Sequence, residues 1–64
     1  MQDITEQIKE ARKVADYTQQ QVADLTGIAL ITYKQYEGGR RWPSYDYLLL
    51  LSSVLKTSFI IEGE

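Results

Sequence analysis

Apolar residues recur three and four positions apart in four segments of the chain, and this period predicts short amphipathic helices. The first is expected to begin near residue 3 or 5 and to end at residue 16. The others are expected over about residues 19–25, 30–37 and 45–55, and residues 58–62 fit one last helical turn. The side chains expected to face the core are Ile4, Ile8, Ala11, Ala15, Val22, Ala23, Ile28, Tyr33, Tyr36, Leu48, Leu51, Ser52, Leu55 and Phe59, with Leu25 as a further candidate.

Start and stop signals set the second and third helices apart from the rest of the chain. Thr18 and Gln21 lie three residues apart, which is typical of a capping box at a helix N-terminus. Gly27 supplies a positive φ at low cost for a tight turn, and the glycine pair at 38–39 ends the next helix. Residues 18–43 therefore indicate two short helices joined by a tight turn and followed by two arginines.

This order is the layout of a helix-turn-helix, whose second helix enters the major groove of DNA. The groove is about 12 Å wide and admits one helix, whose side chains must project beyond the body of the domain. The N-terminal end of the predicted third helix offers Leu30 and Ile31, with Lys34 and Gln35 one turn further along. These four residues are the candidates for contact with base edges.

The segments beside such a helix must offer positive charge or backbone N–H groups to phosphates. The predicted second helix begins at Thr18 and Gln19, where free backbone amides can face a phosphate. Arg40 and Arg41 follow the third helix and can reach the phosphates beyond it. The pattern therefore provides both kinds of contact that a DNA-binding module needs.

Four features occur together: Arg12 in the first helix, TQQQVADLTGI over the second helix and turn, YEGGRRWP after it, and an apolar helix at 48–55. From about residue 8 to residue 63 the chain resembles the lambda-repressor and Cro-type helix-turn-helix family, also called the xenobiotic-response-element type. The ending SFIIEGE is similar to the last short helix of phage members. The resemblance implies a single all-α domain of five helices over residues 1–64. It also implies a phage- or prophage-type repressor that binds double-stranded operator DNA as a homodimer.

The family pattern implies roles for individual residues. Gln19 matches a glutamine that binds phosphate and supports the third helix, and Thr32 matches a position that often meets phosphate. Arg12 and Glu37 match a partly buried, structural ion pair between the first and third helices. The residues expected at the DNA are Thr18, Gln19, Leu30, Ile31, Thr32, Lys34, Gln35, Arg40 and Arg41.

Three positions depart from the family pattern. Ala29 replaces the usual Ser or Thr cap before the third helix, at a cost on the order of 1 kcal/mol. Gly38 replaces an asparagine that often touches phosphate. Leu30 and Ile31 replace polar base readers, and neither can donate or accept a hydrogen bond, although both can pack against a thymine methyl group. Sequence discrimination is therefore expected to depend on Lys34, Gln35 and methyl contacts.

The charge of the chain is unevenly distributed. The net charge is −2, which is unusual for a DNA-binding protein. Residues 29–43 nevertheless carry Lys34, Arg40 and Arg41 against Glu37, a net charge of +2, while the segments on either side carry −2 each. The basic segment coincides with the predicted recognition helix and loop, so the acidic faces are expected to stay away from the duplex.

The composition disfavours several other classes of protein. Histidine and cysteine are absent, so disulfides, the usual zinc sites and the commonest catalytic bases and nucleophiles are excluded. We expect no enzyme activity, metal or cofactor. No apolar stretch approaches 18 residues and no secretory leader is evident, so the expected location is the bacterial cytoplasm, at the nucleoid.

A second apolar stripe on the predicted fourth helix leaves the type of partner open. Tyr47, Leu50 and Val54 form this stripe, and a helix in a 64-residue monomer rarely needs two apolar faces. Together with Ile60 and Ile61 they are the candidates for dimerisation. In the alternative hypothesis, the chain is a protein-binding adaptor or antagonist that keeps the fold and uses Leu30 and Ile31 to contact a protein partner.

Overall fold

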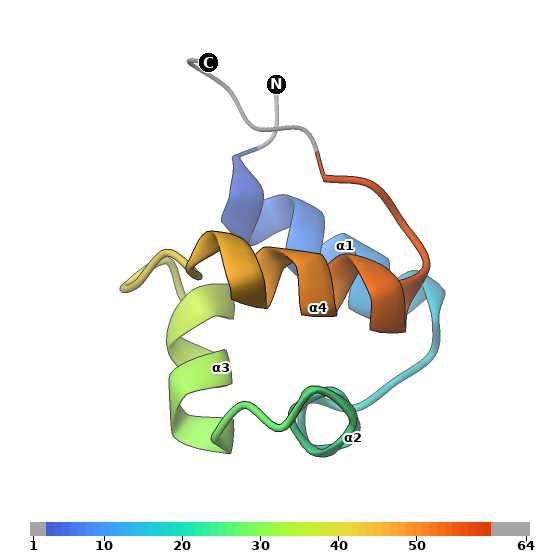
Figure 1. Ribbon diagram of the computed structural model, residues 1–64, viewed down its shortest axis with the longest axis horizontal. Helices are drawn as coiled ribbons and strands as arrows, with labels where there is room; N and C mark the ends of the chain where they lie inside the picture. The colour runs from blue at the N-terminus through green and yellow to red at the C-terminus, as the bar shows by residue number, and fades with distance from the viewer. Residues whose placement is uncertain (1–2, 60–64) are drawn as a thin grey trace.

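The computed structural model describes residues 3–59, which contain four α-helices and no strand. The helices are α1 (Ile4–Val14), α2 (Gln19–Thr26), α3 (Leu30–Glu37) and α4 (Tyr45–Leu55). In Figure 1, α4 runs across α1, and α2, seen end-on, and α3 lie below them and contact each other. α3 packs against α1 and α2, and α4 packs against the same two helices. The described part of the chain is therefore one all-α unit.

The prediction of five helices is wrong for the described residues. α4 ends at Leu55 because Lys56 takes a left-handed conformation, with φ of 54°, and residues 57–59 are not helical. The remainder of the predicted last turn, residues 60–62, lies outside the described residues. Phe59 nevertheless packs against the core as expected, so an apolar contact takes the place of the predicted helical turn at this position.

Side-chain caps begin three of the four helices. Asp3 accepts a hydrogen bond from the backbone N–H of Glu6, at 3.0 Å, and Ser44 caps α4 by accepting one from Tyr47. Thr18 and Gln21 form the predicted capping box at α2. α3 has no side-chain cap because the residue before it is Ala29. Each cap satisfies a backbone donor that has no partner within its own helix.

One core joins all four helices. Its buried side chains are Ile4, Ile8, Val22, Ile28, Tyr33, Tyr36, Leu48, Leu51 and Leu55, with Ala11, Ala15, Tyr17, Val54 and Phe59 packed against them. Leu25 is not part of it, since 56% of its surface is exposed. Ser52 is only partly buried, and its hydroxyl donates to the carbonyl of Leu49.

Candidate nucleic-acid interface

The connection between α2 and α3 is a tight turn held by local hydrogen bonds. Gly27 ends α2 in the left-handed conformation, with φ of 78°, and its N–H donates to the carbonyl of Ala23. Ile28 then fills the space between the helices and is only 3% exposed. The hydroxyl of Thr26 donates to the carbonyl of Val22, at 2.8 Å, and accepts from the N–H of Ile28, at 3.3 Å. The angle at which α3 leaves α2 is thus fixed by an apolar plug and local hydrogen bonds.

Glu37, at the end of α3, holds α1, α2 and α3 together. Arg12 of α1 binds its carboxylate twice, with Nε 2.6 Å from Oε2 and Nη2 3.2 Å from Oε1. Gln19 of α2 donates to Oε1 at 3.0 Å, and the Tyr33 hydroxyl donates to Oε2 at 2.5 Å. Arg12 also donates to the carbonyl of Tyr17, at 2.8 Å. This arrangement contains the ion pair implied by the family pattern. It adds Gln19, which the resemblance implied as a support of the third helix, and Tyr33, which the sequence indicated only as a core residue.

The surroundings of Glu37 keep its carboxylate ionised although it is only 6% exposed. Burial alone would raise its pKa, but hydrogen bonds from Arg12, Tyr33 and Gln19 outweigh that effect and lower the pKa below the ordinary value of 4.5. The hydrogen bond to Glu37 raises the pKa of Arg12, and burial raises that of Tyr33. Glu37 and Arg12 therefore stay charged, and Tyr33 stays neutral, near neutral pH.

α3 divides into a buried and an outward face. Tyr33, Tyr36 and Glu37 are buried, whereas Ile31 and Lys34 are exposed. Leu30, Thr32 and Gln35 lie between the two faces and are partly buried. The outward face of α3 therefore presents one aliphatic side chain in its first turn and one basic side chain a turn later, with partly buried side chains on either side.

The N-terminus of α2, at the opposite end of that helix from the turn, lies beside the C-terminal end of α3 and presents a defined set of donors. The capping box uses the backbone N–H groups of Thr18 and Gln21, bonded at 2.8 and 3.0 Å. The amides of Gln19 and Gln20 belong to the same first turn, where helix geometry supplies no carbonyl partner. The side-chain amide of Gln19 is held by Glu37, so its position is coupled to the end of α3.

The loop after α3 carries the two arginines at its surface. Gly39 has a positive φ of 77°, and the backbone N–H of Arg40 donates to the carbonyl of Gln35 at 3.0 Å. Arg40 and Arg41 are both exposed. Burial and Tyr47 raise the pKa of the Tyr36 phenol, and the positive charge of Arg41 partly offsets them.

Among the described residues, the side chains proposed from the sequence to form a dimer contact are only partly exposed to solvent. Tyr47 and Leu50 are partly exposed, but the Tyr47 ring contacts Tyr36, with centroids 6.4 Å apart, and Val54 packs against the core. Ile60 and Ile61 lie outside the described residues. Tyr45 and Leu49 are more exposed than this stripe, which the sequence pattern did not single out. Helical spacing alone does not show whether a Val or Tyr side chain faces the domain's own core or the solvent.

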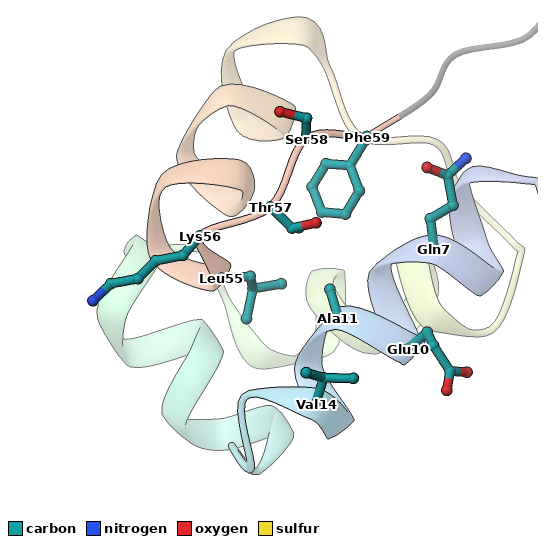
Figure 2. Close-up of a pocket in the computed structure, with 9 residues that line it drawn as sticks. All are labelled: Gln7, Glu10, Ala11, Val14, Leu55, Lys56, Thr57, Ser58 and Phe59. Carbon is teal, nitrogen blue, oxygen red and sulfur yellow. The ribbon is translucent and has the colours of Figure 1, made fainter.

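A hollow among the described residues lies elsewhere, between α1 and the segment that begins at the end of α4. This open groove has a volume of about 340 Å³ and is lined by Gln7, Glu10, Ala11 and Val14 of α1 and by residues 55–59 (Figure 2). None of the residues expected at DNA lines it. Residues 3–59 contain no grouping of acidic side chains able to hold a metal ion, and none of the four helices is long and apolar enough to cross a membrane.

Comparison with known proteins agrees with this geometry. The helix-turn-helix family model matches residues 8–60, which include all four helices except the first turn of α1. The chain belongs to the helix-turn-helix family of the Cro and lambda-repressor type. The match includes both α2 and α3 and the turn between them. No solved structure matches the chain significantly.

The helix-turn-helix relatives are transcriptional regulators by name. The chain is 39% identical to the HTH-type transcriptional regulator YqaE of Bacillus subtilis, over 94% of the chain and 53% of YqaE. It is 38% identical to the cryptic phage CTXphi transcriptional repressor RstR of Vibrio cholerae, over 86% of the chain and 49% of RstR. It is 40% identical to the HTH-type transcriptional regulator AnsR of Bacillus subtilis, over 83% of the chain and 46% of AnsR. The chain thus spans about half the length of the relatives it matches.

Proposed function

We propose that this helix-turn-helix domain binds double-stranded DNA sequence-specifically and regulates transcription, with α3 in the major groove. The orientation of α3 carries the proposal, because its tyrosines are buried and its Ile31 and Lys34 face outward. A helix held in this way can enter a groove about 12 Å wide without rearrangement. Relatives named as transcriptional regulators and as a phage repressor support the same function.

In this proposal the residues beside α3 bind phosphates. Arg40 and Arg41 follow the C-terminal end of α3, and the first turn of α2, at Thr18 and Gln19, lies beside that same end through the bond from Gln19 to Glu37. Thr32, one residue after Ile31 and partly exposed, is proposed to contact a phosphate at the edge of the groove. These contacts fix the register of α3 along the groove, and Lys34 and Gln35 then discriminate bases.

Selection from a pool of random duplexes tests the proposal directly. Tagged protein is incubated with the pool at low salt, and bound duplexes are recovered and sequenced over several rounds. We expect a short motif, and duplexes that carry it should bind more tightly than scrambled ones of equal composition. Recovery of no motif at low salt would contradict sequence-specific binding.

We propose further that the regulator is a non-enzymatic repressor of phage or prophage type, acting at the nucleoid in the bacterial cytoplasm. The phage repressor among the relatives supports the direction of regulation. A reporter gene whose promoter contains the selected motif tests it. Expression of the protein should lower the reporter signal, and scrambling the motif should restore it, whereas activation by the intact motif would contradict repression.

A homodimer on DNA is the finer part of this proposal. One copy measures 30 × 21 × 19 Å, and two half-sites lie about 34 Å apart, so a dimer is needed to cover both. The partly exposed Tyr47 and Leu50 of α4, with Val54, are proposed to supply the contact. Sedimentation with and without a two-half-site duplex tests this part. A 1:1 complex at tens of micromolar would contradict it, and Leu50→Glu should abolish pairing while Lys56→Glu should not.

The alternative, a protein-binding adaptor that contacts its partner through Leu30 and Ile31, rests on the 71% exposure of Ile31 and the net charge of −2. Amide chemical shifts measured on addition of duplex separate the two hypotheses. DNA binding should shift Thr18, Thr32 and Arg41 together, because they lie along one expected phosphate track. An adaptor would show no such joint shift.

A further inference from the structure

Ile31 is the one large aliphatic side chain of α3 that faces solvent. It is 71% exposed, whereas the neighbouring Leu30 is partly buried. The sequence pattern left these two residues equivalent as apolar replacements for base readers. The structure separates them, since Leu30 already has part of its surface covered by its own domain.

The backbone of α3 sets the direction of Ile31. Lys34 and Gln35 follow it by three and four residues and therefore share its face of the helix. Tyr33 and Tyr36 lie on the opposite side, in the core. A β-branched side chain in a helix strongly prefers one χ1 rotamer, so Ile31 loses little conformational freedom when it is covered. Ile31 is therefore a preorganised apolar contact in the first turn of the outward face.

The major groove offers such a side chain one apolar target, the C5 methyl group of thymine. Thymine and 5-methylcytosine both carry this methyl group, and they differ at C4, where thymine has a hydrogen-bond acceptor and cytosine a donor. Ile31 can neither donate nor accept a hydrogen bond, so it cannot sense the difference at C4. Contact with Ile31 therefore depends only on the presence of the methyl group.

We propose that Ile31 reads the C5 methyl group of one pyrimidine in each half-site. The domain then favours thymine over uracil, and 5-methylcytosine over cytosine, by the same factor at that position. This inference rests on the proposed DNA-binding function and makes part of the recognition sensitive to cytosine methylation. Covering one methyl group corresponds to about a fourfold change in affinity.

Two pairs of duplexes measure the methyl contribution without changing any other group. Each thymine of the selected motif is first replaced, one at a time, by deoxyuridine, to find the position at which binding weakens. At that position one pair compares thymine with uracil opposite adenine, and the other compares 5-methylcytosine with cytosine opposite guanine. Fluorescence anisotropy gives the dissociation constants. We expect the methyl group to tighten binding about fourfold within each pair.

Three variants identify the side chain responsible. Ile31→Ala should reduce both ratios to about one, because its methyl group cannot reach as far into the groove. Leu30→Ala should retain them, since Leu30 is partly turned toward its own domain. Leu49→Ala removes a side chain that is 51% exposed on α4 and serves as the matched control, with both ratios unchanged.

The possible failures are distinguishable. Absence of any preferred motif contradicts the proposed DNA-binding function, and with it this inference. A clear motif in which every thymine can be replaced by deoxyuridine without loss contradicts the role of Ile31 alone. The same holds if both ratios persist in Ile31→Ala, or if they vanish in Leu30→Ala instead.

Discussion

Glu37 is a buried acid that receives hydrogen bonds from α1, from α2 and from its own helix. Arg12, Gln19 and Tyr33 share its two oxygens, and no buried polar side-chain atom among the described residues is left without a partner. A network in which every polar atom is paired stabilises the fold, whereas removal of one charge leaves the other buried without a counter-charge. The position of α3 on the domain therefore depends on one carboxylate.

Glu37→Gln should be strongly destabilising. The neutral amide leaves the Arg12 guanidinium without its counter-charge and turns an N–H group toward other donors, which typically costs about 3–5 kcal/mol for a buried pair. The free energy of unfolding is measured by urea titration. Glu10→Gln, at an exposed position of α1, is the matched control and should change stability by less than about 0.5 kcal/mol. Equal stability of the two variants would contradict a structural role for the network.

The same carboxylate should make the fold sensitive to acid. Its pKa is lowered in the folded state, so its ionised form stabilises the fold above the ordinary carboxyl value of 4.5. This contribution is lost as the pH falls from 4.5 through the lowered folded-state value. Urea titrations at several pH values should show the free energy of unfolding decreasing in this window. The decrease should be smaller in Glu37→Gln and unchanged in Glu10→Gln, and equal slopes in all three proteins would contradict the assignment.

At the scale of the elements, α3 is the helix with the weakest local start. Ala29 precedes it with φ of −59° and ψ of 139°, and contributes no side-chain acceptor to the first turn. α1, α2 and α4 each have such an acceptor. α3 is held by its buried tyrosines and by Glu37, so the tertiary contacts compensate for the missing cap.

Ala29→Ser should stabilise the domain. The backbone at this position is already extended, as an N-cap residue requires, so the serine hydroxyl can accept from the N–H of Thr32. The expected gain is about 0.5–1 kcal/mol in the free energy of unfolding, measured by urea or thermal unfolding. Ala29→Val adds a side chain without an acceptor and is the control. A gain of the same size in both variants would show that capping is not the cause.

At the scale of the molecule, charge is separated along the chain. The segment that includes α3 and the arginine loop carries +2, while the rest of the chain carries −4. Arg40 and Arg41 are exposed at the end of α3, so the positive charge lies next to the face expected at DNA. A domain of this kind is expected to bind DNA in one orientation and with few phosphate contacts.

Arg41→Ala should weaken binding to all duplexes by a similar factor. A phosphate contact carries no base information, so its loss leaves the preferred motif unchanged. The slope of log affinity against log salt should fall by about 1. Anisotropy titrations at several salt concentrations measure both effects. Lys13→Ala, at an exposed position of α1, is the control, and an equal loss of slope in that variant would contradict a specific contact at Arg41.

Local signals in the sequence predicted most of the helix bounds. Thr18, Gly27 and Ser44 act through their own backbone neighbourhood, so the ends of α2, α3 and α4 are correct to within one residue. The prediction of a fifth helix is wrong for residues 58 and 59. The apolar spacing of residues 58–62 indicates only which side chains face the core, and facing the core does not require a helical backbone. Residues 57–59 use Phe59 as a single contact instead.

The sequence by itself determined the all-α class, the helix-turn-helix layout and the basic segment, because capping, turn geometry and charge depend on residues close together in the chain. Only the tertiary structure decided that Gln19 and Tyr33 share Glu37 with Arg12. It also separated Ile31 from Leu30. Burial and hydrogen bonding of these side chains depend on how α1, α2 and α3 cross, and helical periodicity alone does not specify those angles.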